Sequence, residues 1–175
     1  TFAVRTSVII SSEAKYSMEA QFLAKEAIEY VQNMRNTQIL KHIKDPLITE
    51  WLGELDNMCS QKFPDGVSPK PCTIDLADMS VVGSDYDVSV AVCDTGVDGC
   101  PLMRYNTQTY RYGYGSGVDW IDTSYTREVI ITDPNTGGSV DDANIEALVT
   151  VRVYWEGRTG KKQIVYQESL FNWIN

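Results

Sequence analysis

The spacing of apolar residues predicts one long helix over the first 35–43 residues of the chain. Apolar and small side chains recur at alternating intervals of four and three residues, which is the period of a helical stripe. The stripe consists of Tyr16, Ala20, Leu23, Ala27, Tyr30 and Met34. Most charged residues between positions 13 and 35 fall on the other face. At about 1.5 Å per residue the helix would span roughly 50–60 Å, so we expect its start to project beyond its own domain.

After this helix, the periodicity predicts a second short helix and then a series of strands. Apolar residues spaced by four run from Ile43 to Leu55, and Pro46 suits a first helical turn, so this helix is expected to begin near Asp45 and Pro46. Residues 59–72 are rich in proline and are predicted to form a loop. Alternating patterns predict strands over residues 87–92, 110–114, 125–131, 145–155 and 161–171.

This order of elements predicts the α+β class. A long N-terminal helix would pack on an antiparallel sheet, and loops closed by disulfides would connect the sheet strands. A length of 175 residues suits one domain with a substantial core. We expect residues 1–43 to form the helix and residues 44–175 to form a globular head with a C-terminal antiparallel sheet.

The charge balance excludes some classes of partner. With 15 basic and 24 acidic residues the net charge is −9, and the acidity lies mostly between residues 51 and 150. Nucleic acid and anionic membrane surfaces attract a basic face, so we expect this domain to bind neither. No segment approaches the roughly 20 apolar residues of a membrane-spanning helix. Because the first residue is Thr1 rather than methionine, we expect a processed or shortened product.

Four cysteines allow three disulfide pairings, which the sequence leaves open. These are Cys59, Cys72, Cys93 and Cys100. Pairing of neighbours would close two loops dense in Pro, Gly and Asp, where a covalent link restricts a flexible segment. A zinc site competes, but the spacing contains no Cys-x-x-Cys pair and the single histidine, His42, is distant. We therefore expect disulfides, which indicate an oxidising compartment outside the cytoplasm.

The residues that could carry catalysis are sparse. His42 is the single histidine, and it lies near the end of the predicted helix, where a positive charge is favourable. The chain has no hydrolase, phosphate-binding or dinucleotide-binding motif. We expect no enzymatic activity and no cofactor. Paired carboxylates such as Asp85 and Asp87 leave a secreted carboxylate enzyme as a distant alternative.

A calcium site is the one metal site that the sequence suggests. Asp94 and Asp98 lie in a short loop between two cysteines, as at the start of a calcium-binding loop. Gly96 and Tyr105 stand where such a loop needs oxygen ligands, so a plain turn is favoured. A second weak candidate lies in a later loop and consists of Asp133, Asn135, Asp141 and Asp142.

A cluster of aromatic residues follows these cysteines. Its candidate ligand-binding members are Tyr110, Tyr112, Tyr114 and Trp120. Tyrosine and tryptophan provide a large contact area at low entropic cost, which suits contacts with a glycan or a protein. They are also common in strands, and packing within the sheet is the favoured interpretation.

Segments near both ends of the chain carry a family resemblance. They are AQFLAKEAIEYVQNMRN at 20–36, YTREVII at 125–131, VTVRVYW at 149–155 and LFNW at 170–173. The first resembles the exposed half of the first helix in type IV pilin-like proteins, above all minor pilins related to the pilus-modification protein V. The others resemble an Arg-containing strand, a Val-x-Val-x-Trp strand and a final Leu-x-Asn-Trp of that group. Ala27 replaces the group's usual glycine.

The resemblance implies a subunit that is made as a membrane-anchored precursor, cleaved, and packed into an extracellular filament. The cleavage site, the early glutamate and the apolar anchor of the family are absent, as expected if the chain begins partway along the helix. Residues 1–43 would be the exposed half of the pilin helix. Its first part would face neighbouring subunits through Phe2, Val4, Val8, Ile9 and Ile10.

The expected function is therefore that of a minor pilin in adhesion, motility or DNA uptake. Its partners would be other pilin subunits, with a host-cell protein or glycan as a further partner. Contact with the membrane would occur only through the missing segment, at the cytoplasmic membrane before assembly. Two alternatives stay open: a surface adhesin that uses its Tyr- and Trp-rich sheet, and a pseudopilin of a type II secretion system.

Overall fold

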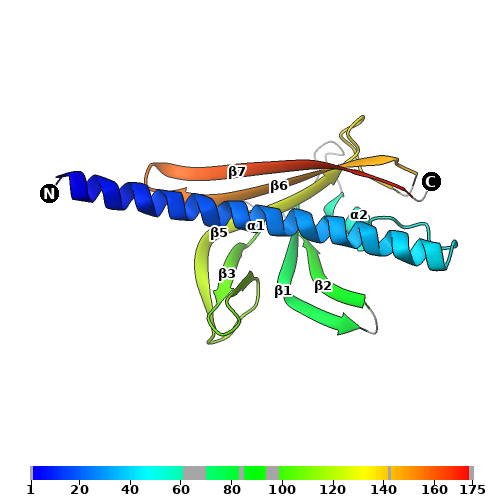
Figure 1. Cartoon of the computed structure of the whole chain (residues 1–175), viewed down its shortest axis with the longest axis horizontal. Helices are drawn as coiled ribbons and strands as arrows, with labels where there is room; N and C mark the ends of the chain where they lie inside the picture. The colour runs from blue at the N-terminus through cyan, green and yellow to red at the C-terminus, as the bar shows by residue number, and fades with distance from the viewer. Residues whose placement is uncertain (1, 61–69, 83–84, 94–98, 142, 174–175) are drawn as a thin grey trace.

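The computed structural model describes residues 2–60, 70–82, 85–93, 99–141 and 143–173. A long N-terminal helix packs along an antiparallel sheet, and the chain is α+β as predicted (Figure 1). The helices are α1 (Phe2–Lys44) and α2 (Glu54–Cys59). The strands are β1 (Cys72–Val82), β2 (Asp85–Val92), β3 (Leu102–Asn106), β4 (Arg111–Gly113), β5 (Trp120–Thr132), β6 (Glu146–Gly157) and β7 (Gly160–Phe171).

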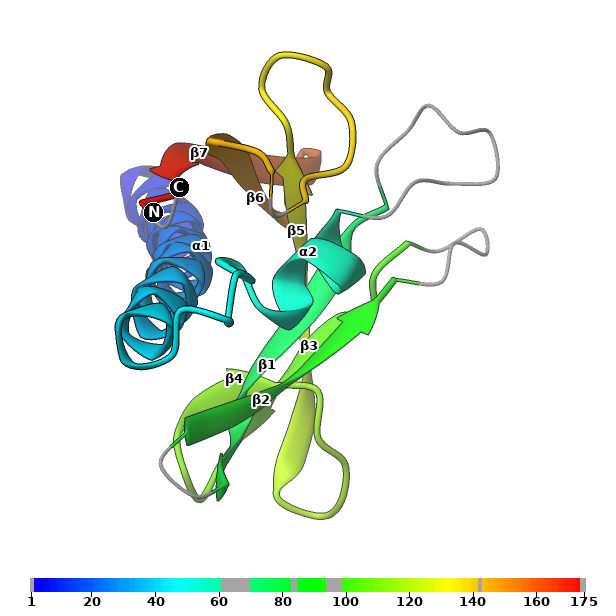
Figure 2. The same cartoon turned by 90° about the vertical axis from the view of Figure 1, so that its right-hand side faces the viewer.

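The long strand β5 organises the sheet. Along one edge it pairs with β6, which continues to β7, and along the other it pairs with β3 and, at Cys72 opposite Val129, with β1. Strands β2 and β4 extend the sheet beyond β1 and β3. Seen along the helix axis, β6 and β7 lie above α1, and β1 to β4 extend away on the other side of β5 (Figure 2). The part of the sheet that covers the helix is therefore the C-terminal part.

The core lies between α1 and the sheet. Small residues let the helix approach closely, because Ala20, Ala24 and Ala27 are completely buried there. Leu23 and Val31 fill the space beside them. The strand residues that complete this core are Val129, Ile131, Val149, Val151 and Val153. The predicted stripe thus covers the sheet, with Tyr30 and Met34 half-buried at its border.

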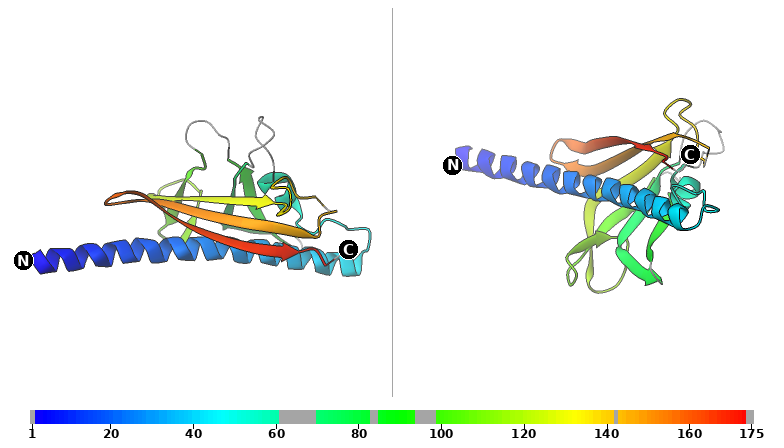
Figure 3. Two further views of the ribbon diagram at one scale, coloured as in Figure 1. Left: turned by 90° about the horizontal axis from the view of Figure 1, so that it is seen from above. Right: turned by 45° about the vertical axis from the view of Figure 1, so that its right-hand side comes forward.

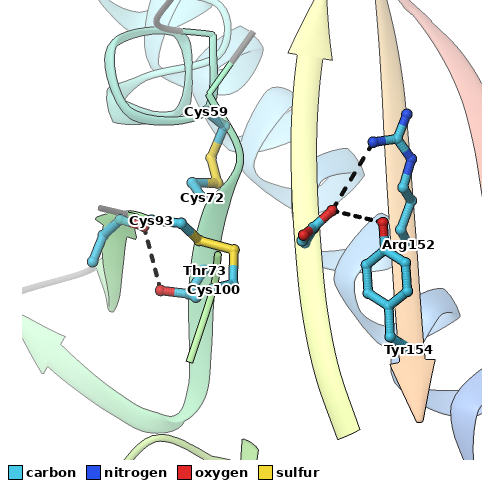
Figure 4. Close-up of a disulfide and its surroundings, with 9 residues drawn as sticks. Cys59, Cys72, Thr73, Cys93, Cys100, Arg152 and Tyr154 are labelled. Carbon is cyan, nitrogen blue, oxygen red and sulfur yellow. Dashed lines mark hydrogen bonds and ion pairs between the residues drawn. A yellow bond between two sulfur atoms is a disulfide. The ribbon is translucent and has the colours of Figure 1, made fainter. Parts of the chain in front are cut away.

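Two disulfides lie where β1 begins and β2 ends, and each joins two cysteines that are neighbours in the sequence. Cys59 is bonded to Cys72, and Cys93 is bonded to Cys100. The two bonds lie close together (Figure 4). The amide of Cys93 donates to the carbonyl of Pro71 (2.9 Å), the residue before Cys72. The disulfides indicate an oxidising location outside the cytoplasm. None of the helices that the structure describes has an apolar stretch of the length needed to cross a bilayer.

The short helix predicted near Asp45 and Pro46 is wrong, because the chain turns there. The carboxylate of Asp45 accepts a hydrogen bond from the amide of Leu47 (3.1 Å), and its carbonyl accepts one from the amide of Ile48 (3.0 Å). The second helix, α2, begins only at Glu54. Of the apolar residues spaced by four, only Trp51 and Leu55 are buried, whereas Ile43 and Leu47 are exposed.

Candidate functional site

The helix α1 is the candidate functional element, and a buried arginine joins it to the sheet. Arg127 of β5 is completely buried. Its guanidinium donates to the Glu26 carboxylate (3.0 Å), to the Leu23 carbonyl (3.1 Å) and to the Ile74 carbonyl of β1. One side chain therefore connects the middle of α1 to two strands that do not follow each other in sequence.

A tyrosine of the same strand forms a second junction nearer the start of α1. The hydroxyl of Tyr125 donates to the Glu19 carboxylate (2.6 Å) and lies 3.3 Å from the Tyr16 carbonyl. Burial, and then the hydrogen bond to Glu19, raise the pKa of Tyr125 far above its usual value of 10.0. The Tyr125 and Tyr16 rings are also in contact, with centroids 6.5 Å apart. This junction fixes the helix along its axis as well as against the sheet.

One contact of α1 with the head close to the start of the helix lies at the β6–β7 hairpin. Glu13 accepts a hydrogen bond from the backbone amide of Arg158 (3.0 Å). The helix continues from there to Phe2, and its N-terminal end projects past the hairpin (Figure 3). Eleven residues at about 1.5 Å each make this projecting segment, residues 2–12, roughly 16 Å long.

The predicted assembly residues belong to this projecting segment. Phe2, Val4, Val8, Ile9 and Ile10 all lie in α1, but their side chains lie outside the part of the structure that is described. Between residues 11 and 44, the outward face of the helix carries four exposed large apolar side chains. These are Met18, Phe22, Leu40 and Ile43.

Several acidic residues assigned to the polar face of the helix in fact contact the sheet. Glu13, Glu19 and Glu26 border the buried stripe and accept hydrogen bonds from β5 or the β6–β7 hairpin. Gln32 likewise donates to Glu168 of β7. The sequence did hold a sign of this contact, because Arg127 occupies a buried-face position of the alternating strand between Tyr125 and Val129. Its partner, Glu26, lies 101 positions away and could not be identified from the sequence.

The predicted aromatic ligand surface does not form one exposed face. Tyr112 packs against Tyr105 and Tyr125, with ring centroids 5.1 and 6.1 Å away. Burial raises the pKa of Tyr114 and outweighs the opposing charge of Arg127. The Trp120 ring covers Gly115, where a Cβ would lie 2.4 Å from it. The remaining residue of the predicted surface, Tyr110, is 75% exposed.

A groove with both polar and apolar side chains lies between α1 and the strands β1 and β4. It has a volume of about 480 Å³. Its lining residues are Glu26, Glu29, Tyr30, Asn33, Leu76 and Arg111. Carboxylates on the helix thus share the groove with an arginine on the sheet and with the apolar side chain of Leu76.

The candidate calcium ligands fall into two groups. Asp94, Asp98 and Asp142 lie outside the described residues. The Asp133 carboxylate accepts hydrogen bonds from the Asn135 amide (2.9 Å) and the Thr136 hydroxyl (2.8 Å), and these bonds lower its pKa below the usual 3.8. Within the described residues, no three His, Cys, Asp or Glu side chains gather closely enough to hold a metal ion.

The histidine has a structural partner. His42 Nδ1 lies 2.7 Å from the Ile48 carbonyl, so the ring links the end of α1 to the turn that follows it. This contact places His42 at the helix end, as the sequence predicted. The basic residues of the last helical turn, Lys41 and Lys44, accompany it there.

Comparison with known proteins adds no relative. No protein-family model, curated protein or solved structure matches the chain. The architecture itself, a long N-terminal helix packed against an antiparallel sheet, is pilin-like. The functional interpretation therefore depends on the geometry of α1.

Proposed function

We propose that this protein is a structural subunit, a minor pilin, of an extracellular type IV pilus-like filament. The observation that carries the proposal is the course of α1. The helix is joined to the head at Arg127, Tyr125 and Glu13, and then continues for about three turns past the hairpin.

A projecting helix of this kind suits assembly. The segment from residue 2 to residue 12 contains Phe2, Val4, Val8, Ile9 and Ile10, and apolar side chains on an isolated helix gain free energy by packing against another surface. An isolated segment this short is marginally stable as a helix in water. We expect neighbouring copies of the same segment to pack against it in the filament.

The junctions on α1 support the same role. A subunit that is held by its helix must transmit force from helix to head without separating from it. Arg127 and Tyr125 join the helix to the central strand β5 through charge-assisted hydrogen bonds, which are stronger than neutral ones. The two disulfides agree with a location outside the cytoplasm.

The test is incorporation of an Ile9→Asp variant of the full-length protein into filaments sheared from cells that lack the wild-type protein. We expect the variant to be absent from the filament fraction while its head remains folded, as judged by protease resistance. The matched control is Val118→Asp, the same chemical change at a head residue that is 99% exposed. Normal incorporation of Ile9→Asp would overturn the proposal. Wild-type protein confined to the cell envelope would instead favour the pseudopilin alternative.

A further inference from the structure

Strand β7 forms an open edge of the sheet. Among the described residues it pairs only with β6, and its twelve residues run along the rim of the sheet above α1 (Figure 1). An open edge presents a row of backbone donors and acceptors that can pair with another strand. The side-chain contact of β7 with the helix lies on a face of the sheet, where Glu168 accepts a hydrogen bond from Gln32 of α1.

The hairpin register determines which backbone groups lie on this edge. Gly157 pairs with Gly160 across a two-residue turn, so this closing pair exchanges both hydrogen bonds. Bonded and non-bonded pairs then alternate along the strand. The amide and carbonyl groups of Lys161, Gln163, Val165 and Gln167 therefore point away from β6, toward the open edge.

We propose that β7 pairs with β7 of a second copy of this chain, antiparallel and around a two-fold axis at Val165. Val165 would then face its own counterpart as a hydrogen-bonded pair, which requires the outward-facing backbone groups that its register provides. The axis also places Ile164 opposite Tyr166 of the second copy. Two seven-stranded sheets would join into one continuous sheet.

The side chains of β7 are complementary in this one register. Lys162 faces Glu168 of the second copy, and the two-fold axis repeats the pair, so two opposite-charge contacts form. Ile164 and Tyr166 are only partly buried in the single chain, and Val165 is 47% exposed. Pairing would bury all three further, and an aromatic residue opposite a β-branched one is a favourable cross-strand pair.

This dimer is separate from the proposed filament. Antiparallel pairing of β7 reverses the direction of the second α1, whereas the filament proposal needs only the projecting N-terminal segment. Failure of either proposal therefore leaves the other intact.

The first test is thiol cross-linking of the purified chain. All four native cysteines are in disulfides, so one added cysteine is the single free thiol. Val165→Cys would bring two Cα atoms within about 5.5 Å across the axis. The matched control, Gln163→Cys, lies on the same strand face, but its two copies would be roughly 14 Å apart. We expect a short bismaleimide to give dimers with Val165→Cys only; equal yields from both variants, or none, would overturn the register.

The second test is charge reversal followed by sedimentation from micromolar to millimolar concentration. We expect the wild type to dimerise, Lys162→Glu to weaken dimerisation about tenfold, and the exchange Lys162→Glu with Glu168→Lys to restore it. Lys161→Glu is the matched control, since its side chain lies on the opposite face and meets Ser169. A wild type that stays monomeric throughout, or equal effects of Lys161→Glu and Lys162→Glu, would overturn the proposal.

Discussion

The guanidinium of Arg127 lies 3.0 Å from the carboxylate of Glu26 and has no exposed surface of its own. Glu26 keeps 39% of its side chain exposed, so the pair is buried on one side only. The charge of Arg127 is therefore neutralised by a group on a different element, the helix α1. Any change in the position of the helix alters the environment of a buried cation, and this makes the helix orientation energetically costly to change.

Glu26→Gln should lower the free energy of unfolding by about 2 kcal/mol, because it leaves the guanidinium buried without its counterion. Urea denaturation followed by circular dichroism measures this change. Glu29→Gln is the matched control, one turn away on the exposed face, and should change stability by less than about 0.5 kcal/mol. Equal effects of the two variants would show that the pair contributes no specific stability.

Regular periodicity allowed the helix and the C-terminal hairpin to be predicted from sequence. The stripe from Ala20 to Val31 and the alternation of β6 and β7 each repeat over many residues without Gly or Pro. Strand β1 was not predicted from the alternation of its residues. Its pairing with β2 is also irregular, because the register shifts between Asp75 and Met79. Asp75 is also buried, where its carboxylate accepts from the amides of Ala77 and Tyr114. A buried acidic residue and an irregular register together make this strand difficult to predict from sequence.

The contacts that define the candidate site depend on tertiary structure. Glu26 follows the polar pattern of the helix, and nothing local distinguishes it from Glu29. Its partner becomes apparent only when β5 is placed against α1. Sequence identified the helix that carries the site but not the side chains that hold it.

Tyr125→Phe should lower the free energy of unfolding by about 1–2 kcal/mol, since it removes the hydrogen bond to the charged Glu19 while it preserves the ring packing. Chemical denaturation measures the loss. Tyr110→Phe deletes the same hydroxyl from a ring that is 75% exposed and should have almost no effect. The proposed junction would be rejected if both variants matched the wild type.

Removal of the disulfides should have unequal effects. Cys59 and Cys72 are 13 positions apart and both completely buried, whereas Cys93 and Cys100 are 7 positions apart. The entropy of loop closure gives about 3 kcal/mol for the longer loop and about 2.5 kcal/mol for the shorter one. Cys59 and Cys72 also belong to the main core cluster, which does not include Cys93 and Cys100, so the double Ser variant at 59 and 72 should be the less stable by thermal unfolding. The reverse order would contradict this argument.

The stability of the fold should decrease at alkaline pH because of its tyrosines. The pKa values of Tyr112, Tyr114, Tyr125 and Tyr154 are raised above 10.0, in each case first by burial. As the pH rises above 10.0, these groups lose protons in the unfolded chain before they do so in the folded one. The unfolded state then binds fewer protons, so the free energy of unfolding falls with pH.

Tyrosinate absorbance separates this effect from the ionisation of lysine, which occurs in the same range. At a pH just above 10.0, we expect the folded protein to show fewer ionised tyrosines than the same protein unfolded in urea. Tyr125→Phe should narrow this difference in ionisation by removing one of the tyrosines whose pKa is raised, in this case through burial and through Glu19. Identical titration curves for the folded and unfolded chains would mean that these hydroxyls are not held in the protonated form, and that the contact between Tyr125 and Glu19 does not persist in solution.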